Sequence, residues 1–75
     1  MKNTELDFDW SALPKWANWI AMDEDGDWYH YSDKPQIDKH PIWVCSEYNE
    51  AIPKKYYPKN FTGDWKKSLF NVPEK

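Results

Sequence analysis

Aromatic and apolar residues alternate with other residues on both sides of an Asp25-Gly26 dipeptide. An Asp-Gly pair between two such runs is typical of a β-hairpin, because glycine readily adopts the positive φ that a tight turn requires. We therefore predict two antiparallel strands, over residues 18–23 and 27–32, joined by a two-residue loop.

The two-residue loop sets the register of the predicted hairpin and places Met22 opposite Tyr29. The side chains that would then share a face are Ile20, Met22, Tyr29 and Tyr31 on one side, and Trp19, Ala21, Trp28 and His30 on the other. Both faces carry aromatic rings. We therefore expect either flanking segments of the chain or a partner molecule to cover the second face.

Further strands are predicted beyond the hairpin. Residues 41–45 are short, aromatic and β-branched, which favours a third strand that begins at Pro41, where a proline costs no ladder hydrogen bond. Residues 50–52 are the candidate fourth strand. The simplest arrangement is an antiparallel meander, in which successive strands are neighbours.

The connecting segments are too short or too rich in proline for long regular elements. Residues 10–17 predict a turn or a single 3₁₀ turn, and residues 33–41 predict a loop. Residues 53–61 favour an extended path that lays Tyr56 and Tyr57 over one face of the sheet.

Near the C-terminus the pattern predicts one short helix. Trp65 and Leu69 have the i, i+4 spacing of a helix face, Thr62 or Asp64 can cap its start, and Pro73 lies beyond its end. The predicted fold is a small, mainly β domain: a three-stranded antiparallel meander, with four strands as the alternative, and a short C-terminal helix.

The chain has 75 residues, including 6 Trp, 5 Tyr and 3 Phe, so we expect a single domain over residues 1–75 whose core is largely aromatic. Residues 1–8 are polar and acidic and are expected to be loose. Cys45 is the single cysteine, and His30 and His40 have no further cysteine or histidine residues nearby in the sequence to complete a structural zinc site. We therefore expect no disulfide, metal or cofactor. A domain of this size leaves a homo-oligomer open.

Charge is distributed unevenly along the chain. Residues 1–38 hold nine Asp or Glu and three Lys (3 − 9 = −6), whereas residues 39–75 hold four Asp or Glu and seven Lys (7 − 4 = +3). Every cation is lysine, and arginine is the residue best suited to bidentate contacts with phosphate and guanine. Nucleic acid is therefore not the expected partner. The sequence shows no signal-peptide pattern and no apolar run long enough to cross a membrane, so we expect a cytoplasmic protein without membrane contact.

The acidic segment around Asp25-Gly26 is the first candidate site. An EF-hand calcium loop that began at Asp23 would need glycine at its sixth position and glutamate at its twelfth. This chain has Trp28 and Lys34 at those positions, so the segment does not fit a calcium loop. On a rigid hairpin its carboxylates can steer association with a basic protein surface, and a merely solubilising turn is the alternative. The predicted partner-binding residues are Asp23, Glu24, Asp25, Asp27, Trp28 and His30.

A second candidate surface lies in the lysine-rich C-terminal half. Lysine beside tyrosine is typical of proteins that hold single-stranded nucleic acid by charge and stacking. The residues of this alternative are Lys54, Lys55, Tyr56, Tyr57, Lys66 and Lys67. Solvated surface lysines are the simpler interpretation of the same residues.

Catalytic residues are not predicted. His30 and Cys45 could be paired as base and nucleophile across neighbouring strands, but a hydrolase also needs an oxyanion hole and a substrate cleft, which so small a sheet seldom encloses. We therefore expect a protein that is not an enzyme.

Two strings, DWSALPKWANWIAMDEDGDWYHY and TGDWKKSL, together resemble a set of short, Trp-rich proteins encoded by tailed bacteriophages. The resemblance covers roughly residues 9–70, and Lys66 stands where such proteins often carry arginine. It implies a phage origin and a place in the host cell cytoplasm, and it does not imply an activity. The functional hypothesis is a viral, non-enzymatic protein that binds and modulates or inhibits a bacterial host protein, such as a defence or nucleic-acid-processing factor.

Overall fold

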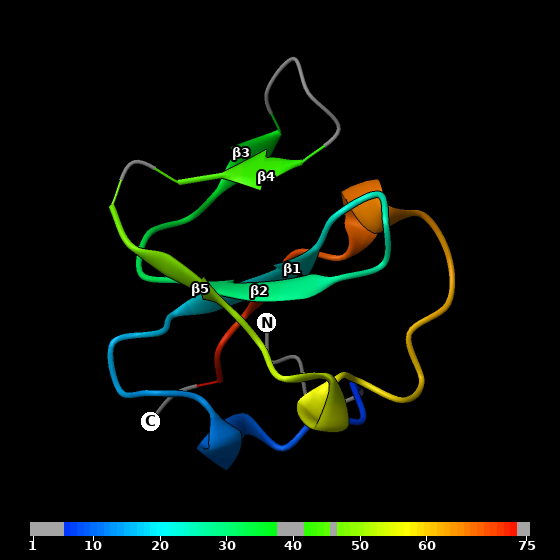
Figure 1. The fold of residues 1–75 in the computed structure, drawn as a ribbon, viewed down its shortest axis with the longest axis horizontal. Helices are drawn as coiled ribbons and strands as arrows, with labels where there is room; N and C mark the ends of the chain where they lie inside the picture. Colours follow the sequence, from blue (N-terminus) through cyan, green and yellow to red (C-terminus); the bar gives the residue numbers. More distant parts are fainter. Residues whose placement is uncertain (1–5, 38–41, 46, 74–75) are drawn as a thin grey trace.

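Two antiparallel sheets provide most of the regular structure in the computed structural model, which describes residues 6–37, 42–45 and 47–73 (Figure 1). The larger sheet has the order β5-β2-β1-β6, with strands β1 (Trp19–Met22), β2 (Trp28–Tyr31), β5 (Asn49–Ala51) and β6 (Phe70–Asn71). The smaller sheet pairs β3 (Gln36–Ile37) with β4 (Trp43–Val44). The described residues also form 3₁₀ turns η1 (Trp10–Ala12), η2 (Lys54–Tyr56) and η3 (Trp65–Lys67). The predicted small, mainly β, antiparallel fold is confirmed.

The β1–β2 hairpin is present, but its loop has three residues rather than two. The Asp23 N–H donates to the Asp27 carbonyl at 2.9 Å, and the Gly26 N–H donates to the Asp23 carbonyl at 2.9 Å. Gly26 has a φ of 92°, so a tight turn followed by a glycine bulge replaces the predicted two-residue turn. The Asp25 carboxylate also accepts the Asp27 N–H at 3.0 Å, which stabilises this longer loop.

The longer loop shifts the register of the hairpin by one residue. Met22 lies opposite Trp28 rather than Tyr29, and Ile20 lies opposite His30. Because side chains alternate between the faces of a strand, the predicted groups of residues are wrong for β2. The observed groups are Ile20, Met22, Trp28 and His30 on one face, and Trp19, Ala21, Tyr29 and Tyr31 on the other.

The predicted meander is wrong, because the segment expected to supply its third strand leaves the main sheet. Within residues 33–41, predicted as a loop, Gln36 and Ile37 form β3 and pair with β4. The main sheet instead gains β5 beside β2, close to the fourth strand predicted over residues 50–52. The predicted start of the third strand at Pro41 lies outside the described residues.

The predicted C-terminal helix is not confirmed. Asp64 does cap a turn, with its carboxylate accepting the Lys66 N–H at 3.0 Å, but only the short 3₁₀ turn η3 follows. The chain then joins β1 as β6. A longer helix is incompatible with this pairing, because Phe70 and Asn71 must be extended to reach the sheet edge. The 3₁₀ turn expected within residues 10–17 is confirmed by η1.

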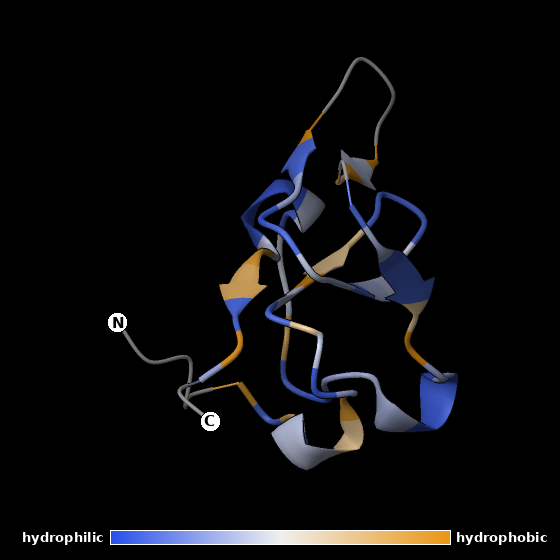
Figure 2. Ribbon diagram, turned by 90° about the vertical axis from the view of Figure 1, so that its left-hand side faces the viewer, coloured by the Kyte–Doolittle hydropathy of each residue, from blue (hydrophilic) through white to orange (hydrophobic). Residues whose placement is uncertain are grey.

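Different parts of the same chain cover the two faces of the main sheet. The N-terminal segment and η2 run below the sheet in Figure 1, and the β3–β4 hairpin and η3 lie above it. The first core contains the buried side chains of Leu6, Ile20, Trp28 and Ile52. The second core contains Ala21, Tyr31 and Trp43, with Trp65 and Leu69 packed against them. Tryptophan and tyrosine supply much of these cores, and their intermediate hydropathy gives them pale colours in Figure 2.

The described part of the N-terminal segment belongs to the first core. Leu6 is buried and Phe8 packs beside it, with the Phe8 and Trp10 rings 4.9 Å apart. The rest of the range predicted as loose, residues 1–5, lies outside the described residues. Among the described residues, no helix is long and apolar enough to span a membrane.

Candidate protein-binding site

The six residues predicted to bind a partner are divided by the structure into an exposed loop and a buried base. Glu24 and Asp25 are exposed at the tip of the β1–β2 hairpin. Asp27 is half-buried beside them. The other three, Asp23, Trp28 and His30, are 8%, 3% and 4% exposed. A partner can therefore contact the tip but not the aromatic residues assigned to the same site.

Asp23 holds the smaller sheet against the hairpin. Its Oδ1 accepts the backbone N–H of Trp43 at 2.9 Å. Burial raises the pKa of Asp23, and the negative charges of Asp25 and Asp27 add to that rise, whereas the hydrogen bond from Trp43 opposes it. The Trp43 indole Nε1 also donates to the Met22 carbonyl at 3.1 Å. Asp23 is thus part of the structural junction between the two sheets.

Trp28 belongs to the first core. Its ring meets the Phe61 ring edge to face, with centroids 5.5 Å apart, and stacks at 6.4 Å on Phe70. Next to it, Asp27 accepts a hydrogen bond from the Tyr57 hydroxyl at 3.2 Å. The prediction that Trp28 offers a contact surface is therefore not compatible with its position.

His30 is buried against Trp16 and the β5 strand. Its ring stacks on Trp16 with centroids 5.0 Å apart, and its Nε2 lies 4.0 Å from Oε1 of Glu50, its cross-strand neighbour. The Nδ1 atom is buried and has no hydrogen-bond partner among the described residues. Burial lowers the pKa of His30, although Glu50 opposes that effect.

We expect the protein to lose stability as the pH falls below about 6.5, the ordinary pKa of histidine. The folded-state pKa of His30 is lowered, so between the two pKa values the unfolded chain binds more protons than the folded one. Each pH unit in that window costs at most about 1.4 kcal/mol. Urea unfolding at a series of pH values in this range gives the slope of the free energy of unfolding against pH. The control is His30→Gln, which lacks the His30 imidazole and keeps His40. Matching slopes in the two proteins would contradict the prediction.

Beside the acidic tip lies an aliphatic surface that the sequence analysis did not identify. This surface consists of Ile42 and Val44, which are 38% and 37% exposed. They flank Trp43, which is buried, so the alternation along residues 42–44 was the signal in the sequence that could have revealed them. A pocket of about 400 Å³ connects this surface with the tip, and its walls include Asp23, Asp25, Ile42 and Val44.

The lysines of the nucleic-acid alternative do not form one surface. Lys54 and Lys55 lie in η2, below the main sheet in Figure 1, and Lys66 and Lys67 lie in η3, above it. Their aromatic neighbours also differ: Tyr57 packs on the first core, whereas Tyr56 is exposed, with the Lys55 Nζ 5.2 Å from its ring centroid. The two lysine clusters therefore lie on different sides of the main sheet.

Catalytic and metal sites gain no support from the geometry. Cys45 packs against the second core, whereas His30 lies on the opposite face of the main sheet, so they do not form a nucleophile and base pair. Within residues 6–37, 42–45 and 47–73, no three His, Cys, Asp or Glu side chains are grouped to hold a metal ion.

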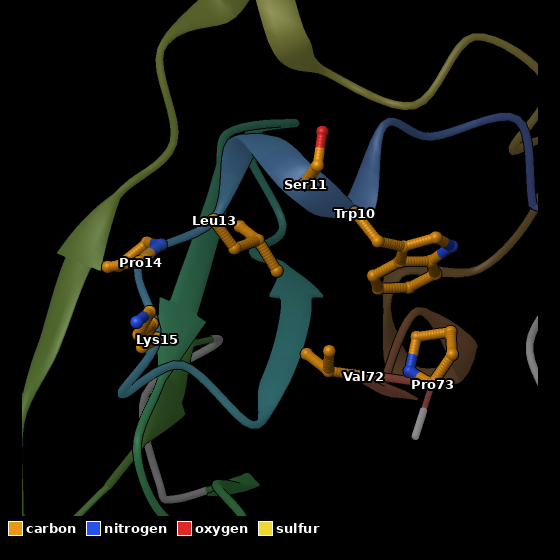
Figure 3. A pocket seen from close by; sticks show the side chains of 7 residues that line it. All are labelled: Trp10, Ser11, Leu13, Pro14, Lys15, Val72 and Pro73. Carbon is orange, nitrogen blue, oxygen red and sulfur yellow. The ribbon is translucent and has the colours of Figure 1, made fainter. Parts of the chain in front are cut away.

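A second concavity lies between the N-terminal turn and the chain after β6. Figure 3 shows this pocket of about 280 Å³, in which the Trp10 ring stands beside Pro73, and Leu13 and Val72 point into the same space. Its lining is mainly apolar, with Ser11 and Lys15 as the polar residues. It lacks the convergent polar groups that orient a specific ligand.

No protein-family model, curated protein or solved structure matches this chain.

Proposed function

We propose that this chain is a non-enzymatic interaction protein that binds a host protein through the acidic tip and the adjoining aliphatic surface. The observation that carries the proposal is the adjacency of these two features around one pocket. Exposed Ile42 and Val44 supply apolar area, and Asp25 supplies negative charge at its edge. An apolar centre with a charged rim is the arrangement that protein interfaces use.

The chemistry of the surface selects the partner. The charged residues that line the pocket are carboxylates, and Glu24 adds a further exposed negative charge at the tip. Such a surface attracts a basic patch on another protein, and it repels the phosphates of nucleic acid. The tip is also rigid, because Asp25 and Gly26 fix the loop and Asp23 fixes its base. Rigidity lowers the entropy that association would cost.

The biological setting rests on the resemblance to short phage proteins. A viral origin, expression in the cytoplasm of an infected bacterium and modulation or inhibition of a defence or nucleic-acid-processing factor are the corresponding parts of the proposal. A small domain without catalytic residues can act there by occupying the partner's basic surface, which such factors use to bind nucleic acid.

Affinity capture from bacterial lysate tests this function. We expect the wild-type chain to enrich a specific basic protein. Val44→Asp, or the pair Glu24→Gln and Asp25→Asn, should reduce its recovery by about tenfold or more, because a few central contacts supply most of the binding energy of a protein interface. Lys54→Gln with Lys55→Gln, on the far side of the molecule, is the control and should retain capture. Equal recovery by all variants would contradict the proposed surface.

A further inference from the structure

The pocket beside the acidic tip has one sign of charge and walls of mixed chemistry. It is bounded by the β1–β2 hairpin on one side and by β4 on the other, with a volume of about 400 Å³. Asp23 and Asp25 are its charged lining residues, and Tyr29, Ile42 and Val44 supply aromatic and aliphatic surface. An open pocket with two carboxylates suits a cation that has an apolar stem.

The two carboxylates are fixed in the same way. Oδ1 of Asp23 accepts the Trp43 N–H at 2.9 Å, and Oδ1 of Asp25 accepts the Asp27 N–H at 3.0 Å. Within the described residues, no hydrogen bond reaches the second oxygen of either side chain. Each aspartate is therefore oriented by the backbone and keeps one oxygen for a ligand.

Asp23 points to a ligand for a reason independent of the clustered charge. Its side chain is held in a residue only 8% exposed, it lines the pocket, and it has no cationic partner among the described residues. A buried carboxylate without a cation is costly, and a cation in the pocket would offset that cost.

Tyr29 adds an aromatic wall to the pocket, and the pKa of its hydroxyl reflects the negative charge around it. Burial raises the pKa of its hydroxyl, and the nearby charges of Asp23, Asp27 and Asp25 raise it further. The same negative field that disfavours a phenolate favours a cation over the ring.

We propose that this pocket receives an arginine side chain of the partner protein. The inference rests on the proposed function, because the side chain belongs to that partner. The guanidinium has five donors in a plane, so it can donate to more than one carboxylate oxygen at once, and it stacks on aromatic rings. Its methylene stem matches Ile42 and Val44. Lysine would supply a compact, more strongly hydrated charge that fits two separate carboxylates and a ring less well.

The test uses the isolated protein and small probes. We expect Nα-acetyl-arginine methylamide to give saturable NMR shifts of the Trp43 and Asp27 amides, which donate to the two aspartates, with a Kd of about 1–10 mM, typical of a single side chain. The lysine analogue should bind several-fold more weakly. The citrulline analogue, which is isosteric with arginine but neutral, should leave both amides unshifted. Equal shifts with citrulline, or lysine binding as tight as arginine, would overturn the assignment.

Two variants of the hairpin tip separate the pocket from general electrostatics. Asp25→Asn keeps an oxygen that can accept the Asp27 N–H but removes the charge, and it should weaken the arginine probe about tenfold. Glu24→Gln removes an equal charge from the same loop, outside the pocket lining, and should change the affinity less than about twofold. Equal losses in the two variants would show nonspecific attraction and refute the site.

The outcomes also separate this inference from the proposed function. If lysate capture depends on Val44 but the arginine probe does not bind, the arginine site is refuted and the interaction function stands. If the probe binds at the Trp43 and Asp27 amides but no protein is captured specifically, the site stands as a guanidinium pocket and the proposed function is refuted.

Discussion

Replacing Trp28 by alanine should destabilise the protein by about 3–5 kcal/mol, the range for a fully buried large aromatic residue. Trp28 is 3% exposed and its ring contacts both Phe61 and Phe70. Small domains have a free energy of unfolding of roughly 5–15 kcal/mol, often at the lower end. We therefore expect a substantial unfolded population of Trp28→Ala even without denaturant, measured by far-ultraviolet circular dichroism and urea titration.

The matched controls use aromatic residues of different burial. Trp28→Phe keeps an aromatic ring in the first core and should cost clearly less than Trp28→Ala. Tyr56→Ala removes a ring that is 36% exposed and should change the free energy of unfolding by less than about 0.5 kcal/mol. A Trp28→Ala protein as stable as Tyr56→Ala would contradict the central place of this side chain in the core.

Replacing Ser68 by alanine should cost about 1–3 kcal/mol, because the change leaves a buried polar group without a partner. Ser68 is fully buried at 0% exposure, and its Oγ accepts the Met22 N–H at 2.7 Å. The same hydroxyl can donate to the carbonyl of Trp65 at 2.6 Å or of Met22 at 3.0 Å. One side chain thus joins η3 to the last residue of β1.

Hydrogen exchange gives this prediction a local measurement. The Met22 amide should exchange faster in Ser68→Ala than in the wild type, beyond any change explained by global stability. The control is Ser11→Ala, whose hydroxyl bonds to Asp9 at the surface and whose loss should cost less than about 0.5 kcal/mol. Unchanged protection of Met22 would show that the serine does not hold the strand.

The local pattern predicted the hairpin but could not predict its register. Asp25-Gly26 is compatible with both a two-residue and a three-residue loop, because glycine supplies a positive φ in each. In the three-residue loop, the Asp25 carboxylate accepts the Asp27 N–H, a contact that favours the longer loop. Asp25 also belongs to the acidic tip, so the sequence pattern indicated a charged binding residue and did not indicate its hydrogen bond within the loop.

The candidate site was predicted in part for a related reason. Glu24 and Asp25 are exposed as expected, but Trp28 and Asp23 are buried by segments distant in sequence. Leu6 and Ile52 cover the face that carries Trp28, and the Trp43 N–H binds Asp23 across twenty residues. Alternation along a strand gives the face of a side chain, but it does not tell which distant segment covers that face.

The pairing of β1 with β6 has a consequence for the order in which the molecule is completed. Ile20 and Phe70 are partners although fifty residues separate them along the chain. During translation the β1–β2 hairpin can form early, whereas β1 keeps an open edge until Phe70 has left the ribosome. Closing so long a loop is slow compared with forming a hairpin, and an unpaired edge can recruit other strands. We therefore expect nascent chains to be most prone to aggregation before β6 pairs with β1.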